Sequence, residues 1–253
     1  MQLDLYYGDN LPVLRSLESG TVDLIYIDPP FNTGKVRTLH NACYEDSYED
    51  YLAFLTPRLQ EARRILKDGG SLFVHLDFRE VHYVKVELDK IFGRKSFVNE
   101  IIWAYDYGAR SKTRWSPKHD NILWYAKSPG EYCFRYDEID RIPYMAPSLV
   151  GPEKAAKGKT LTDCWWCTIV PTNGKERVGY PTQKPLGILE RIVRVHSNPG
   201  DLCLDFFAGS GSFGVAAHRL GRRCILVDSN PDAIRVMQDR FRSLGYLVSN
   251  NFT

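Results

Sequence analysis

The stretch VDLIYIDPPF, residues 22–31, combines a buried strand with an unusual end. The residues of VDLIYI are almost all apolar and mostly β-branched or aromatic, which predicts a strand inside a sheet. The strand must stop at Pro29 and Pro30, since neither has an N–H group for a neighbouring strand. A plain Asp-Pro-Pro turn is one interpretation. The other is that the prolines hold Asp28 and Phe31 rigidly for a ligand.

Strands and helices alternate along most of the 253 residues. Apolar runs predict strands at 3–9, 22–27, 71–78, 99–105, 121–128, 201–207 and 222–228. Helical spacing predicts helices at 10–20, 47–70, 79–93 and 185–197, a further helix that ends at 220, and a last helix that begins at 231. Residues 128–180 predict only loops and short strands. The length suits one α/β domain with an insertion or two small domains. The alternation favours a doubly wound, mostly parallel sheet, which binds ligands at the carboxyl ends of its strands.

Composition limits the function classes. A formal charge of +2 gives no overall attraction to nucleic acid or membrane, so a polyanion must bind a local basic patch. We expect no signal peptide in MQLDLYYGDN and no membrane segment, since no apolar run approaches roughly 20 residues. The six scattered cysteines predict a reducing cytoplasm. Cys164 and Cys167 form one CxxC pair without a second pair, so we expect no metal site.

A second strand end is found in LDFFAGSGSFG, residues 204–214. Gly209 and Gly211 predict a turn into a helix whose N-terminus approaches a ligand closely. A dinucleotide site is one alternative, but Asp205 before the turn would repel a pyrophosphate and suits a cationic group such as an ammonium. Asp228 ends the next strand, where an acid binds ribose hydroxyls in nucleoside-binding folds. Together these residues predict an aminoacyl nucleoside site.

The DPPF segment suits a different ligand. The carboxylate of Asp28 and the carbonyl of Pro29 can serve as paired acceptors, and Phe31 adds a flat apolar face. An exocyclic amino group on a planar base needs two hydrogen bonds and a stacking surface. The segment therefore predicts a site for such a base.

Jointly, these motifs resemble the S-adenosylmethionine-dependent DNA methyltransferases that modify exocyclic amino groups. The resemblance rests on DPPF, DFFAGSG, GDN at 8–10 and ERVGYPTQKP at 176–185, and also on FVNEIIWAY, KHDNILWYAKS and NPGDLCLDFFAGSG. The catalytic strand precedes the cofactor strand, an order called the β arrangement in this family. The resemblance implies a circularly permuted, Rossmann-like methyltransferase sheet. In it the strand at 3–9 lies beside the strand ending at Asp228.

The resemblance also implies residue roles. The flipped target base would be held by Asp28, Pro29, Pro30 and Phe31. S-adenosyl-L-methionine would be bound by Asp205, Phe206, Phe207, Ala208, Gly209, Ser210 and Gly211 around its methionine part, Asp228 at the ribose, Asp9 and Asn10 near the adenine or pocket wall, and Thr182, Gln183 and Lys184 near the methionine carboxylate. Two departures are Phe for the commoner Tyr in DPPF and Ser-Phe for Thr-Thr after the glycine turn.

A basic and aromatic segment divides the two halves. We expect a catalytic half at 1–106, a target-recognition region at 107–178 with a main-sheet strand near 121–127, and a cofactor-binding half at 179–253. DNA contacts are expected from Arg110, Lys112, Arg114, Lys118 and His119, with Trp115, Trp124 and Tyr125 interleaved, and from a loop holding Lys35 and Arg37. A second cationic loop carries Lys154, Lys157 and Lys159. A solvated basic face is the alternative.

Asp at the first position of DPPF is more common in adenine-N6 enzymes of the family than in cytosine-N4 enzymes. The resemblance therefore implies methylation of adenine N6 in double-stranded DNA, in the cytoplasm. The alternatives are cytosine N4, an RNA or protein amide, and an inactive DNA-binding module. A homodimer and a cognate restriction enzyme are further expectations that the family suggests.

Overall fold

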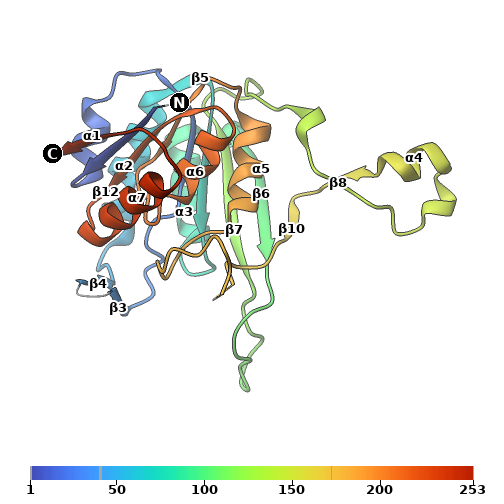
Figure 1. Ribbon diagram of the computed structural model, residues 1–253, viewed down its shortest axis with the longest axis horizontal. Helices are drawn as coiled ribbons and strands as arrows, with labels where there is room; N and C mark the ends of the chain where they lie inside the picture. Colours follow the sequence, from blue (N-terminus) through green and yellow to red (C-terminus); the bar gives the residue numbers. More distant parts are fainter. Residues whose placement is uncertain (1, 40–41, 172, 253) are drawn as a thin grey trace.

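The computed structural model describes residues 2–39, 42–171 and 173–252. Its centre is a nine-stranded sheet of order β10-β6-β7-β5-β2-β11-β12-β1-β13 (Figure 1). The strands are β1 (Leu3–Tyr7), β2 (Val22–Ile27), β5 (Leu66–Leu76), β6 (Phe97–Ala104), β7 (His119–Ala126), β10 (Cys164–Trp166), β11 (Leu202–Asp205), β12 (Arg223–Asp228) and β13 (Val248–Phe252). Every neighbouring pair is parallel except those of β7, which runs antiparallel to β5 and β6.

Helices cover both faces of this sheet (Figure 1). One hydrophobic cluster joins the sheet to α5 (Leu186–His196), α6 (Ser212–Arg219) and α7 (Pro231–Ser243). The other joins it to α1 (Asn10–Ser16), α2 (Tyr51–Ile65) and α3 (Val81–Phe92). Within β2, Leu24 and Tyr26 belong to the first cluster and Ile25 and Ile27 to the second. Burial on both faces explains the nearly continuous apolar run of β2 and confirms the doubly wound α/β fold.

The chain ends meet at one side of the sheet, as the permuted order predicts. Leu3 of β1 pairs in parallel with Cys224 of β12 on one side and with Val248 of β13 on the other. The expected neighbour of β1 is therefore confirmed. The edge strand β13 was not predicted, because VSNNF is short and polar and lacks the apolar alternation of a half-buried strand.

Two segments expected to be loops are regular. β3 (Lys35–Leu39) and β4 (Ala42–Asp46) pair in antiparallel orientation, so the expected loop after DPPF is wrong. The predicted DNA contact Arg37 lies on β3, and its side chain is outside the described residues. The expected cationic loop is also wrong. Lys154 and Lys157 lie on α4 (Pro152–Lys157), and Lys159 begins β9 (Lys159–Thr160), which pairs with β8 (Arg141–Ile142).

Two projections leave the compact body (Figure 1). Residues 105–118 connect β6 to β7 and extend the β6–β7 hairpin beyond the carboxyl edge of the parallel strands; we call them the recognition hairpin. Residues 128–163 form an arm with η2 (Tyr136–Glu138), η3 (Pro147–Leu149) and α4, and η1 (Arg94–Ser96) precedes β6. No helix in the described part of the chain has the length and apolarity of a membrane span.

Candidate active site

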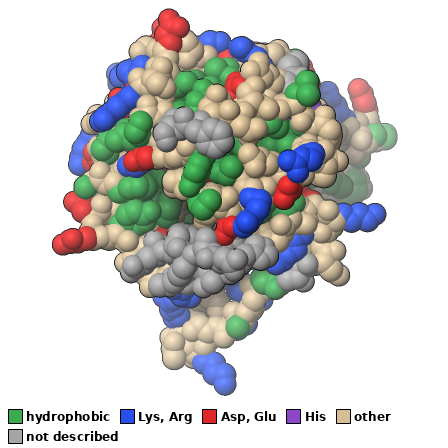
Figure 2. Space-filling view, turned by 60° about the vertical axis from the view of Figure 1, so that its left-hand side comes forward, with side chains coloured by type: hydrophobic (Ala, Val, Ile, Leu, Met, Phe, Trp, Pro, Cys, Tyr) green, Lys and Arg blue, Asp and Glu red, His purple; other side chains and the backbone are tan. Residues whose placement is uncertain are grey.

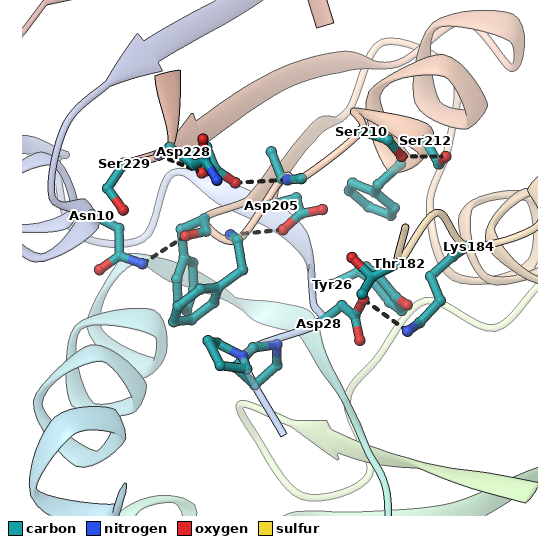
Figure 3. A pocket seen from close by; sticks show the side chains of 18 of the residues that line it. Asn10, Tyr26, Asp28, Thr182, Lys184, Asp205, Ser210, Ser212, Asp228 and Ser229 are labelled. Carbon is teal, nitrogen blue, oxygen red and sulfur yellow. Dashed lines mark hydrogen bonds and ion pairs between the residues drawn. The ribbon is translucent and has the colours of Figure 1, made fainter. Parts of the chain in front are cut away.

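Four acidic residues gather at the carboxyl edge of the sheet. Asp205 and Asp228 end β11 and β12, Asp28 directly follows β2, and Asp9 is the second residue after β1. These four strands lie side by side and parallel. They line one cavity of about 520 Å³, seen from close by in Figure 3. The crevice outside these strand ends is where doubly wound folds bind ligands.

The turn after β2 is held firmly by buried polar contacts. Asp46, nearly inaccessible, accepts hydrogen bonds from the backbone N–H of Asn32 (2.9 Å) and from the hydroxyl of Thr33 (2.6 Å). Asn32 adopts a left-handed φ of 53°, a conformation that asparagine tolerates better than most residues. These contacts fix the backbone that follows DPPF, so Asp28 and Phe31 are presented from a rigid support at the cavity wall.

The carboxylate of Asp28 is only partly satisfied. Its Oδ2 lies 2.9 Å from Nζ of Lys184, while Oδ1 is buried and has no hydrogen-bond partner among the described residues (Figure 3). Nζ of Lys184 also lies 4.9 Å from the centre of the Phe31 ring. An unpartnered buried acceptor is costly to the fold.

The glycine turn after β11 is built as predicted, but its two glycines serve different purposes. Gly209 has φ 51° and donates its N–H to Oδ2 of Asp228 at 2.7 Å, so it joins the cavity wall to β12. Gly211 has φ 70°, and a Cβ there would lie 2.7 Å from Met237. Gly211 does not line the cavity; its lack of a side chain allows α7 to pack closely against the turn.

Burial and mutual repulsion perturb the acids of the cavity. Burial raises the pKa of Asp205 well above its ordinary value, and the charges of Asp28 and Asp228 add to the effect, while a hydrogen bond from the Phe207 N–H (2.9 Å) opposes it. Burial also raises the pKa of Asp228, against hydrogen bonds from backbone N–H groups that include Gly209. A ligand with a positive charge would relieve this concentration of negative charge.

A cluster around Arg58 forms the wall near β1. Its guanidinium donates to Oδ1 of Asn10 (2.5 Å) and Oδ1 of Asp9 (2.9 Å) and lies 4.0 Å above the ring of Phe54. Asn10 in turn donates to the carbonyl of Phe206 at 2.6 Å, which connects the start of α1 to the segment between β11 and the glycine turn. The sequence did not identify Arg58, because it lies within an ordinary amphipathic helix and nothing distinguishes it from surface arginines.

The three residues of the TQK segment, 182–184, have two different structural roles. Thr182 and Lys184 line the cavity, whereas Gln183 does not. Gln183 accepts a hydrogen bond from the Val178 N–H (2.9 Å) and donates one to the carbonyl of Glu176 (2.6 Å). The side chain of Gln183 therefore fixes the loop before α5. The remaining predicted cofactor residues, Asp9, Asn10, Asp205, Phe206, Phe207, Ala208, Gly209, Ser210 and Asp228, all line the cavity.

A buried polar chain supports the catalytic strand. The hydroxyl of Tyr26 lies 2.8 Å from Nδ1 of His75, and Nε2 of His75 lies 3.1 Å from Oδ2 of Asp120. Tyr105 donates its hydroxyl to Oδ1 of Asp120 (3.0 Å). Burial would raise the pKa of Asp120, but the hydrogen bond and charge of His75, with the charge of Lys184, lower it. Every member of this chain therefore has a hydrogen-bonding partner.

The recognition hairpin carries basic side chains and one almost fully exposed aromatic side chain. Trp115 is 97% exposed, whereas Trp124 and Tyr125 are buried in β7, so of the three aromatic residues interleaved with the basic ones only Trp115 is open to a DNA contact. Lys112 and Arg114 are exposed, Arg110 pairs with Asp106, and Lys118 donates to the carbonyls of Gly108 and Ala109. Figure 2 shows blue side chains on the projection at the lower end of the molecule.

Two other predicted DNA contacts lie at the same edge of the sheet. His119 is the exposed first residue of β7, beside the recognition hairpin, and Lys35 is the exposed first residue of β3, just after the DPPF turn. The recognition hairpin and the cavity therefore open toward one side of the molecule.

Comparisons with known proteins agree with this architecture. The profile of the N6/N4 DNA methylase family matches residues 22–239. Type II methyltransferase M.HpaI of Haemophilus parainfluenzae is 31% identical over 245 residues, covering 96% of this chain and 75% of that protein. DNA adenine methyltransferase YhdJ of Escherichia coli K12 is 30% identical over 246 residues, covering 92% and 80%. The structure of TTHA0409 from Thermus thermophilus, complexed with S-adenosyl-L-methionine, has a TM-score of 0.68 at 25% identity and covers 98% of both chains.

Proposed function

Because the chain belongs to the N6/N4 DNA methylase family and is a DNA methyltransferase that uses S-adenosylmethionine, we propose that it methylates N6 of an adenine flipped out of duplex DNA. The observation that carries this proposal is the carboxylate of Asp28, which lines the shared cavity together with the ring of Phe31.

The residues of the cavity suit the cofactor. S-adenosylmethionine, when bound, supplies an electrophilic methyl group on a positively charged sulfur. In this proposal Asp205 faces the cationic methionine end, Asp228 accepts hydrogen bonds from ribose hydroxyls, and the wall formed by Asp9 and Asn10 lies toward the adenine. The raised pKa of Asp205 supports its part, since a cation is what this buried carboxyl group lacks.

Asp28 and Phe31 would receive the target base. A base inside a duplex cannot reach the cavity, so it must leave the stack at a cost of a few kcal/mol. Phe31 would stack on the base, while Asp28 and the carbonyl of Pro29 accept hydrogen bonds from the amino group. Those bonds favour a pyramidal nitrogen and stabilise the positive charge that develops on it, and the rest of the rate acceleration comes from positioning.

Adenine is preferred over cytosine on two grounds. Asp at the first position of DPPF resembles the adenine enzymes of the family, and YhdJ, a relative over most of the chain, is a DNA adenine methyltransferase. The amino-plus-ring-nitrogen edge is common to both bases, so the carboxylate alone does not choose between them.

The test is a transfer assay with DNA amplified in vitro, which carries no methylated bases. The purified protein is incubated with that DNA and cofactor labelled in its methyl group, and the DNA is then digested to nucleosides. We expect the label in N6-methyldeoxyadenosine. Label in N4-methyldeoxycytidine would overturn the choice of base, and label in RNA or protein but not DNA would overturn the proposal.

Other expectations stay predictions. Cytoplasmic location, pairing into a homodimer and association with a restriction enzyme of the same specificity follow from the family resemblance. The division at residues 106 and 178 is likewise a proposal, in which the recognition hairpin and the arm select the target sequence.

A further inference from the structure

The ammonium of Lys184 occupies a position with two notable contacts. Its Nζ lies 2.9 Å from Oδ2 of Asp28 (Figure 3) and 4.9 Å from the centre of the Phe31 ring. The two side chains of the ion pair are only 12% and 15% exposed. A donor on the Asp28 carboxylate beside the Phe31 ring is also what the proposed function requires of the target amino group.

Among the residues that line the cavity, Lys184 is the cation available to pair with Asp28. Arg58 and Lys184 are the two cations among its lining residues, and Arg58 is already bound to Asp9 and Asn10. Lys184 is therefore the cation that stabilises the Asp28 carboxylate while no base is present. A buried carboxylate without it would carry a large desolvation cost.

We propose that Lys184 occupies the binding position of the target base while no base is present. In the free protein its ammonium takes the site of the target amino group on Asp28, and it must leave that site before a base can be methylated. The inference rests on the proposed function, because it uses Asp28 and Phe31 as the base-binding pair. Lys184 is thus a positioning residue that makes entry into the site depend on the energy of DNA binding.

The surroundings permit this exchange. Pro185 follows Lys184 and leads directly into α5, so the backbone is anchored while the four-carbon side chain can rotate. The carboxylate of Asp120 provides a second negative charge for the displaced ammonium. Against the effect of burial, the pKa of Asp120 is lowered by the hydrogen bond and charge of His75 and, to a smaller extent, by the charge of Lys184. A lysine displaced from Asp28 therefore need not enter an apolar region.

A free nucleoside tests the inference without knowledge of the recognition sequence. The dissociation constant of 2′-deoxyadenosine is measured by titration calorimetry on the protein saturated with S-adenosylhomocysteine, for the wild type and for Lys184→Met. Methionine keeps the length of the side chain but cannot donate to Asp28. We expect Lys184→Met to bind the nucleoside about tenfold more tightly than the wild type does. The same titration with 2′-deoxycytidine shows which base gains more.

The control is a lysine with the same kind of contacts elsewhere. Nζ of Lys85 lies 2.7 Å from Asp89 and 4.6 Å from the ring centre of Phe97, on α3 and away from the cavity. Lys85→Met should leave nucleoside binding unchanged.

Several results would overturn the inference. Unchanged or weaker nucleoside binding by a folded Lys184→Met protein would do so, as would a loss of cofactor binding, which would assign Lys184 to the methionine carboxylate. If the variant does not fold, the ammonium signal of Lys184 is followed by ¹⁵N NMR in the wild type, and its insensitivity to added 2′-deoxyadenosine contradicts displacement. Failure of the proposed function is distinct: the wild type would then place no label in DNA.

Discussion

Asp28 and Asp205 lie at the carboxyl ends of neighbouring strands that pair in parallel at Leu24–Cys203 and Ile25–Leu204. Burial raises the pKa of Asp205, and the charge of Asp28 raises it further. The two halves of the proposed reaction, cofactor binding and base binding, therefore share one electrostatic environment. A cavity with this charge favours a cationic ligand and destabilises the protein while it is empty.

Cofactor affinity should depend on pH through Asp205. The positive cofactor binds the ionised carboxylate, and the raised pKa means that protonation removes this charge at a higher pH than for an ordinary aspartate. We expect the affinity for S-adenosylmethionine to fall as the pH falls through that raised pKa. Asp205→Asn should bind about tenfold to a hundredfold more weakly and lose this pH dependence. Calorimetric titration across pH 5 to 8 measures both.

A matched control is Asp23→Asn. Asp23 lies on β2 outside the cavity and pairs with Lys67 at 2.7 Å. Its replacement should leave the pH dependence of cofactor binding intact, and an equal loss in both variants would count against a specific role for Asp205.

The same carboxyl group should reduce stability. A raised pKa means that the native state holds the proton more tightly than the unfolded chain, so the free energy of unfolding falls as the pH rises through the folded pKa. We expect Asp205→Asn to increase the free energy of unfolding at neutral pH by on the order of 1–2 kcal/mol. Urea denaturation without cofactor measures this, and a destabilised variant would contradict the account.

His196 should make the protein acid-sensitive. Burial among Phe73, Trp124 and Phe134 lowers the pKa of His196 from 6.5 to about 3. Between pH 6.5 and 3 the unfolded chain therefore binds a proton at His196 that the native state does not bind. The free energy of unfolding decreases as the pH falls through this range. His196→Gln should reduce the proton uptake on unfolding in this window by about one. The exposed His82 provides the control, since His82→Gln should change nothing.

The recognition hairpin should set the salt dependence of DNA binding. Each phosphate contact contributes about 0.9 to the slope of log affinity against log salt concentration on duplex DNA. We expect Lys112→Ala and Arg114→Ala each to reduce that slope by about this amount, as measured by fluorescence anisotropy. Lys95, at the opposite edge of the sheet before β6, is the matched exposed lysine. A slope unchanged in all variants would exclude these phosphate contacts.

Much of the fold could be predicted because its determinants are local. The apolar run of β2 and the glycine turn after Asp205 specify their elements through burial and backbone freedom alone. Parallel strands place their carboxyl ends at one edge of the sheet, so the sequence predicts that Asp28, Asp205 and Asp228 lie at the same edge.

The rest depends on tertiary contacts. β3, β4 and β13 lack a continuous apolar run, and their pairing is decided by neighbouring elements rather than by periodicity. Trp124 and Tyr125 follow a basic segment in sequence, but β7 lies within the sheet and buries both. The partners of Asp28 and Asp120 come from distant parts of the chain, so no local pattern could identify Lys184 or His75 in those roles.

The central claim is that Asp28 accepts the target amino group. Single-turnover methylation of unmethylated duplex DNA by Asp28→Asn, with cofactor saturating, tests it most directly. We expect a rate about a hundredfold to a thousandfold below that of the wild type, with cofactor affinity within about threefold. A rate near that of the wild type, with label still entering the same methylated nucleoside, would contradict the account.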